Sequence, residues 1–117
     1  MSLRRVLHIF AIASLVIPVI ASGSSQVPRN RTITLVYQYG NATVIQYTPS
    51  FTNTEGCAGG DVANSYAYLD TSLPTSKYMI AAIYTAYATG KKVGVGLSGC
   101  TNNFGGGVPL IYRVELE

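Results

Sequence analysis

Apolar and polar residues alternate along the first stretch of the chain with a clear pattern. From Thr32 to Tyr39 (TITLVYQY), every second residue beginning with Ile33 is large and apolar or aromatic. This period of two is expected of a half-buried strand. Gly40-Asn41 then supplies two residues that tolerate positive φ in a tight turn. Residues 43–48 (TVIQYT) predict the return strand, which Pro49 ends.

One short strand and one helix follow this pair. Residues 50–64 are small and polar and predict a loop, and residues 65–69 (SYAYL) predict a third strand. Ser76–Thr89 (SKYMIAAIYTAYAT) is the one segment with a helical period, and Gly90 is typical of a helix end. The face expected to cover the core carries Met79, Ile80, Ile83, Ala86 and Tyr87.

The opposite face of the helix has a single charge, Lys77, which is unusual for a helix in water. Two interpretations remain open: a weakly polar solvated face, or a face packed against another subunit. In the second case, the oligomer interface would contain Ala81, Tyr84, Thr85 and Ala88.

Two further strands complete the chain. Val93, Val95 and Leu97 alternate with small residues, and residues 110–116 (LIYRVEL) alternate again. The predicted fold class is therefore mainly β with one helix (α+β), in the order β-β-β-α-β-β. That is the order of an OB-fold, a five-stranded Greek-key barrel.

Two glycine-rich segments follow the predicted helix, one in the next strand and one in the loop after it. Gly94, Gly96 and Gly99 spell the G-x-G-x-x-G of a dinucleotide-binding turn, but they lie in a strand that follows the helix instead of opening one. Glycine at each outward position instead indicates that another backbone lies close or that the barrel bends. The run Gly105-Gly106-Gly107 has no following helix and predicts a mobile hairpin loop.

The N-terminus has the layout of a secretory signal peptide. Arg4 and Arg5 precede the 15-residue apolar run 6–20, and small residues follow it. The domain prediction is a signal peptide over 1–23, a flexible segment over 24–31 and one OB-fold-like domain over 32–117. The expected location is the periplasm or the outside of the cell, with no membrane span after cleavage.

Removal of residues 1–23 changes the chemistry that the chain offers. Without Arg4 and Arg5, six of the eight basic residues remain against five acidic ones, so strong attraction to nucleic acid is not expected. The single histidine, His8, is lost as well, which excludes histidine-based catalysis and His-ligated zinc. We expect no enzyme activity, no catalytic residue, no metal site and no cofactor.

Cysteine and tyrosine give the positive signals. Two cysteines, Cys57 and Cys100, in an exported chain predict one disulfide. All nine tyrosines remain after cleavage, in a chain with no tryptophan. A tyrosine offers a flat apolar ring and a hydroxyl, which suits both sugar rings and protein contacts.

The second half of the chain resembles small exported bacterial proteins that share a series of short motifs. These are a strand ending in Y-L-D (Tyr68-Leu69-Asp70), a helix ending in A-x-x-x-G-K-K-V (86–93), a cysteine (Cys100) and a final I-Y-x-V strand (111–114). Over residues 65–116 the pattern is also similar to the OB-fold B subunits of subtilase-type AB5 toxins. This resemblance implies a pentameric ring around the helices and binding of sialylated glycans.

The first two strands do not match the serine-containing glycan site of those subunits, so no site residue is carried over. OB-folds generally bind ligands on strands two and three and the adjoining loops. In this chain those regions hold Tyr39, Asn41, Tyr47, Tyr66, Tyr68, Asn102, Asn103 and Phe104. We expect a secreted binding module for a glycan or cell-surface partner. The alternative is a protein-interaction domain without a small ligand.

Overall fold

The structure is a computed structural model that describes residues 25–117; the predicted signal peptide lies outside the described residues. Five strands, one α-helix and one short 3-10 helix make up the described chain. They are β1 (Ser25–Tyr39), β2 (Ala42–Thr48), η3 (Gly60–Asn64), β3 (Tyr66–Asp70), α2 (Ser76–Thr89), β4 (Val93–Thr101) and β5 (Val108–Leu116). The prediction of a mainly β fold with one α-helix between the third and fourth strands is confirmed.

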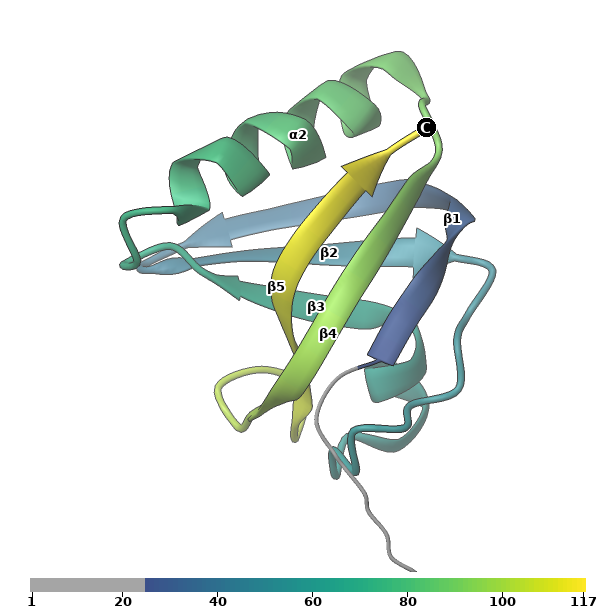
Figure 1. The fold of residues 1–117 in the computed structure, drawn as a ribbon. Coiled ribbons are helices and arrows are strands. Elements are labelled where there is room, and N and C mark those ends of the chain that lie inside the picture. The colour runs from purple at the N-terminus through teal and green to yellow at the C-terminus, as the bar shows by residue number, and fades with distance from the viewer. Residues whose placement is uncertain (1–24) are drawn as a thin grey trace, which may run out of the picture.

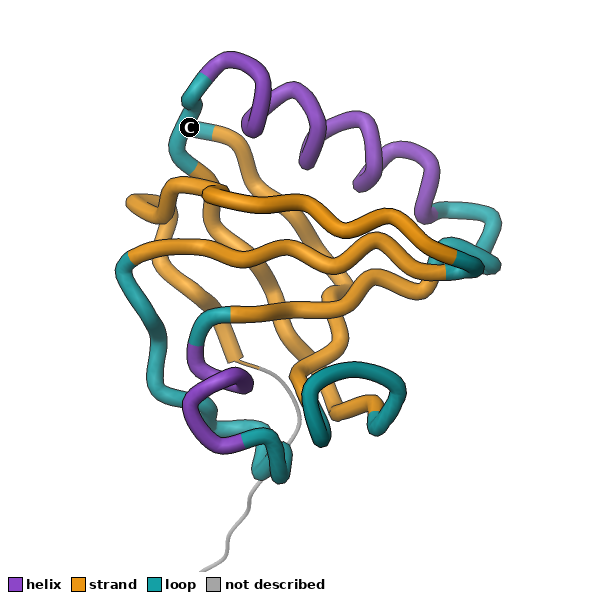
Figure 2. The backbone as a smooth tube through the Cα atoms, turned by 180° about the vertical axis from the view of Figure 1, so that it is seen from behind, coloured by secondary structure: helices purple, strands orange, loops and turns teal. Residues whose placement is uncertain are grey.

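The five strands form one sheet that closes on itself, in the order β1-β2-β3-β5-β4, with β4 pairing back to β1. Neighbouring strands are antiparallel except for β3 and β5, which run parallel. The helix α2 lies along one side of this ring and contacts β1 and β5 (Figure 1). From behind, β1, β2 and β3 cross the front of the ring, and the segment between β2 and β3 and the loop between β4 and β5 lie at its lower edge (Figure 2).

The strand β1 begins at Ser25, so the prediction of a flexible segment over 24–31 is wrong for the residues that the structure describes. Its first part pairs with β4, where Val27 lies opposite Val95, and its second part pairs with β2. Val27 is fully buried. This part of the strand was not predicted because Pro28 and two exposed polar residues follow Val27 and interrupt the alternation of apolar and polar residues.

Two hydrophobic clusters lie on opposite sides of the sheet. The main core fills the ring and includes Ile45, Leu69 and Val95, together with Ile83 from α2. A second cluster lies on the outer face of β2 and β3, where Val44 and other side chains are covered by the start of β5 and the loop before it. The strands β2 and β3 are therefore buried on both faces.

The helix has the predicted bounds. Gly90 ends it in the left-handed region at φ 75°, and its N–H donates to the carbonyl of Ala86. Ile83 and Ala86 are buried as expected, but Tyr87, which was assigned to the core face, is 44% exposed. Tyr87 follows Ala86 by 100° around the helix, which places its long side chain at the edge of the covered face.

Side chains from the neighbouring strands cover the outward positions at Gly94 and Gly96. A Cβ on Gly94 would lie 2.5 Å from Cγ of Arg29, and a Cβ on Gly96 would lie 2.9 Å from the ring of Tyr112. The glycines thus make room for long side chains on β1 and β5, and at Gly94 also for the β1 backbone, because a Cβ there would lie 3.0 Å from the carbonyl oxygen of Val27.

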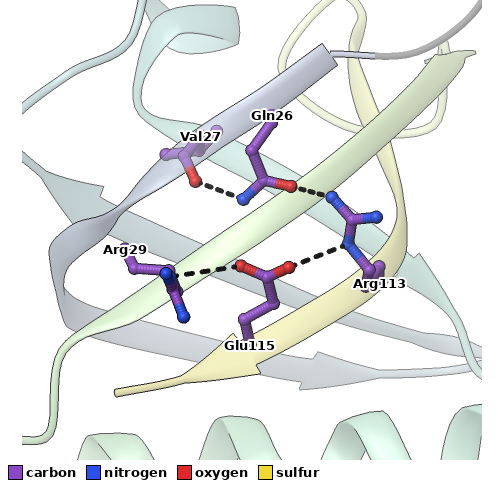
Figure 3. A network of polar contacts seen from close by, with 5 residues as sticks. All are labelled: Gln26, Val27, Arg29, Arg113 and Glu115. Carbon is purple, nitrogen blue, oxygen red and sulfur yellow. Dashed lines mark hydrogen bonds and ion pairs between the residues drawn. The ribbon is translucent and has the colours of Figure 1, made fainter.

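Arg29 also belongs to a polar network on the outside of the sheet, together with Gln26, Arg113 and Glu115 (Figure 3). Glu115 forms ion pairs with Arg29, at 3.7 Å, and with Arg113, at 3.3 Å. Arg113 also donates to Gln26, whose amide nitrogen donates to the carbonyl of Val27 at 2.7 Å. The network connects the start of β1 to β5 across β4.

Candidate functional site

A change of register in β1 decides which of its side chains reach the outer face. The pairing with β2 shifts between Ile33 and Leu35. Ile33 is buried, but beyond the shift Val36 packs against the core and Tyr37 is 39% exposed. A β-bulge reverses the alternation in this way. The simple alternation expected from Ile33 to Tyr39 is therefore wrong after the first buried residue.

Three aromatic rings meet on the outer face, from β1, β3 and the loop between β4 and β5. The ring centroids of Tyr37 and Phe104 are 5.5 Å apart, those of Tyr66 and Phe104 are 5.3 Å apart, and those of Tyr37 and Tyr66 are 6.3 Å apart. We call this group the aromatic surface. Burial, and then the neighbouring Tyr37, raises the pKa of Tyr66 above its usual 10.0, so the Tyr66 hydroxyl stays neutral in ordinary buffers.

An open pocket of about 490 Å³ adjoins the aromatic surface. Tyr68, which lines this pocket, lies two residues after Tyr66 on the same face of β3, and Asn103, which also lines it, directly precedes Phe104 in the loop. The hydroxyl of Tyr39 lies 3.5 Å from the Asn103 carbonyl and joins β1 to this loop. We call this site the polar pocket; it is lined by Asn41, Tyr68, Asp70, Ser72, Cys100, Thr101, Asn103 and Leu110.

The carboxylate of Asp70 is the acidic group of the polar pocket. Its Oδ1 accepts from the Ser72 backbone N–H at 2.9 Å and from the Ser72 hydroxyl at 2.6 Å. These two hydrogen bonds hold the pKa of Asp70 below its usual 3.8, so the group is ionised at neutral pH. Within residues 25–117, no hydrogen bond is recorded to its Oδ2.

The loop over residues 102–107 is held in place by a disulfide and by contacts with the segment around η3. The predicted disulfide between Cys57 and Cys100 is present, with an S–S distance of 2.02 Å. The N–H of Gly59 donates to the carbonyl of Gly107 at 2.9 Å, and a Cβ on Gly105 would lie 2.6 Å from Val62. The expectation of a mobile hairpin is replaced by a loop fixed to η3 and the segment before it.

Most of the predicted ligand-binding residues lie together, with two exceptions. Tyr39, Asn41, Tyr66, Tyr68, Asn103 and Phe104 belong to the aromatic surface and the polar pocket or join them. Asn102 is exposed on the same loop but does not line the pocket. Tyr47 is only 2% exposed and belongs to the main core, so it is not available to a ligand. Tyr47 pairs with Ile33, which lies before the register shift in β1, and the side chains of both residues point into the core.

The predicted ligand-binding set lacks Tyr37 of the aromatic surface and five residues of the pocket lining, namely Asp70, Ser72, Cys100, Thr101 and Leu110. Tyr37 was assigned to the buried side of its strand, and the bulge that exposes it leaves no mark in the sequence. From the sequence alone, Asp70 to Ser72 together with Pro74 indicate only the start of the helix that follows. The pattern Asp-x-Ser, in which the serine donates back to the carboxylate, was the available signal for a fixed carboxylate.

Burial of the Tyr47 hydroxyl has a measurable consequence. This hydroxyl has no hydrogen-bond partner within the described residues, and burial raises its pKa to about 12. An unfolded chain releases the same proton near 10.0. Between these pH values the folded protein binds more protons than the unfolded chain, so stability falls as the pH rises.

We expect Tyr47→Phe to be at least as stable as the wild type at pH 7, with a gain of up to about 1 kcal/mol, because it removes an unpaired buried hydroxyl. The variant should also lose less stability than the wild type between pH 9 and pH 11.5. Urea unfolding at several pH values measures both effects. Equal losses in the two proteins would contradict this account of Tyr47.

The outer face of α2 is exposed and carries no acidic residue. The predicted interface residues Ala81, Tyr84, Thr85 and Ala88 are all exposed, and Tyr78 next to them is 70% exposed. The Tyr84 hydroxyl lies 3.3 Å from Oε1 of Gln38 on β1. This face lies apart from the aromatic surface and is a second place where tyrosines gather.

Within residues 25–117, no three His, Cys, Asp or Glu side chains are grouped as a metal site, and no helix is long and apolar enough to span a membrane. Comparison of the chain with protein-family models, with curated proteins and with solved structures gives no match. The functional argument therefore depends on the geometry of the chain itself.

Proposed function

We propose that the chain is a secreted or periplasmic, non-enzymatic module that binds carbohydrate, and that the aromatic surface and the polar pocket together form its glycan site. The observation that carries this proposal is the position of three aromatic rings directly beside a pocket lined with amide, hydroxyl and carboxylate groups. The apolar face of a sugar ring packs on aromatic rings, while its hydroxyls require such polar partners.

The topology supports the same conclusion. A five-stranded closed sheet ordered β1-β2-β3-β5-β4, with a helix between β3 and β4, supports the assignment of an OB-fold that we propose for this chain. OB-folds bind on the face of strands two and three and the loops that adjoin it, and oligosaccharides are among their ligands. The candidate site occupies that region, with Tyr66 and Tyr68 on β3 and Phe104 on the loop after β4.

Electrostatics favours a sugar over a nucleic acid at this site. No lysine, arginine or histidine lines the polar pocket, and Asp70 gives it a negative charge. Phosphate backbones bind through clustered Lys and Arg, which this surface lacks. Hydroxylated ligands without phosphate do not require such cations.

Binding of the purified protein to a glycan array tests the proposal, and two substitutions locate the site. We expect Tyr37→Ala combined with Phe104→Ala to weaken binding of the best glycan at least tenfold, because the stacking platform is lost. Tyr78→Ala, which truncates an exposed tyrosine on α2, is the matched control and should bind as the wild type does. A protein that retains no glycan, or two variants with equal affinity, would contradict the proposal.

A protein-interaction role is the second candidate, and the outer face of α2 favours it. This face combines exposed tyrosines with small residues and has no acidic side chain. The resemblance to toxin B subunits implies a pentamer formed around such helices. Light scattering of the disulfide-bonded protein, as wild type and as Ala81→Asp, tests this candidate. If α2 mediates self-association, the wild type should be an oligomer and Ala81→Asp a monomer. Two monomers of the same mass would exclude self-association through α2.

A further inference from the structure

The charge of the polar pocket limits the kind of sugar that fits it. Its volume of about 490 Å³ is at the small end for ligand pockets. Asp70 is its one acidic residue, and no basic residue lines it. The ion pairs of the described residues both involve Glu115, so no cation is paired with the Asp70 carboxylate.

The carboxylate is fixed in place with one oxygen still available. Ser72 donates twice to Oδ1, which holds the carboxylate in one orientation. The Ser72 hydroxyl oxygen and Oδ2 of Asp70 both retain lone pairs, so each is able to accept from a ligand hydroxyl. An ionised carboxylate makes shorter and stronger hydrogen bonds to hydroxyls than a neutral group does. Because its two hydrogen bonds to Ser72 also hold the pKa of Asp70 below its usual 3.8, the carboxylate is ionised at neutral pH.

Given the carbohydrate-binding function proposed above, on which this inference rests, we propose that the polar pocket selects uncharged sugars by accepting hydroxyl hydrogen bonds at Asp70, and that it rejects sugars that carry a carboxylate. A ligand carboxylate bound in the pocket would meet the Asp70 carboxylate with no basic residue of the lining to neutralise either group, and like charges repel. This selectivity is the opposite of the one that the toxin resemblance implies, because that family binds sialylated glycans.

An array that presents the same glycan cores with and without a terminal sialic acid tests the selection, with lactose and 3′-sialyllactose as one pair. We expect the wild type to bind the uncharged member of each retained pair at least tenfold more tightly. Asp70→Asn keeps the size and the Oδ1 acceptor but removes the charge. We expect this variant to bind the uncharged glycan several-fold more weakly and to discriminate less than threefold between the two members.

Asp61→Asn is the matched control, because it removes one negative charge from η3, outside the pocket lining, and should keep the selectivity of the wild type. Thermal unfolding shows whether each variant is folded. A wild type that binds the sialylated member equally or more tightly overturns the selection but leaves the carbohydrate-binding function standing. If Asp70→Asn retains the selectivity of the wild type, the proposed role of Asp70 in the selection is overturned as well. A protein that retains no glycan of either kind overturns both proposals.

Discussion

Replacement of Cys57 and Cys100 by serine is expected to lower the free energy of unfolding by about 4 kcal/mol. The two cysteines are 43 residues apart, and opening a loop of this length releases a correspondingly large conformational entropy in the unfolded chain. Such a loss is a large part of the stability of a small domain. The disulfide also anchors the loop over 102–107, so the variant should lose glycan binding before it unfolds.

Urea unfolding of the wild type with and without a reducing agent, next to the double variant, measures this effect. The reduced wild type should match the double variant, and the double variant should not respond to the reducing agent. A loss of less than about 1 kcal/mol would show that the loop closed by the disulfide contributes little.

Substitution of Gly59 by alanine is expected to cost about 2 to 3 kcal/mol. Its φ is −73°, which any residue adopts, so the cause is the lack of space. A Cβ at this position would lie 2.3 Å from the carbonyl oxygen of Gly107 and 2.9 Å from that of Gly105. Both contacts are with backbone, which does not move aside as a flexible side chain does, and overpacking of this kind costs up to about 3 kcal/mol.

Gly90→Ala is the matched control for this substitution. Nothing lies within 4 Å of a Cβ on Gly90, but its φ of 75° disfavours alanine, so a cost of about 1 kcal/mol is expected. The two variants should differ in glycan binding as well, because only Gly59→Ala displaces the loop that carries Phe104. If Gly59→Ala unfolds at the same urea concentration as the wild type, the close contact between these two segments is not present in solution.

The order and type of the main elements were predictable because strong local signals mark them. The helix has a clear period and a terminal glycine at Gly90, and the hairpin after Tyr39 has a glycine and an asparagine at its turn. The 3-10 helix η3 and the first half of β1 were missed. Both are short of local signals: Val27 is buried through its pairing with β4, about seventy residues further along the chain, and no local pattern reports such a contact.

The candidate site was predictable in outline. The expected topology grouped Tyr66, Tyr68 and Phe104, and the structure places these three side chains in one cluster. The inclusion of Tyr47 and the omission of Tyr37 have one common cause, the register shift in β1 that decides which face each side of the hairpin presents. A β-bulge arises from the pairing of two strands, so the alternation of residues within one strand does not predict its position.

An NMR titration tests the central claim most directly, that the aromatic surface and the polar pocket bind carbohydrate. The ¹⁵N-labelled, disulfide-bonded protein is titrated with the uncharged glycan that the array retains best, and the amide shifts are followed. We predict saturable shifts around Tyr37, Tyr66, Asp70 and Phe104, with the amides of α2 unchanged. Shifts confined to α2, or no saturable shift at any amide, would contradict the account.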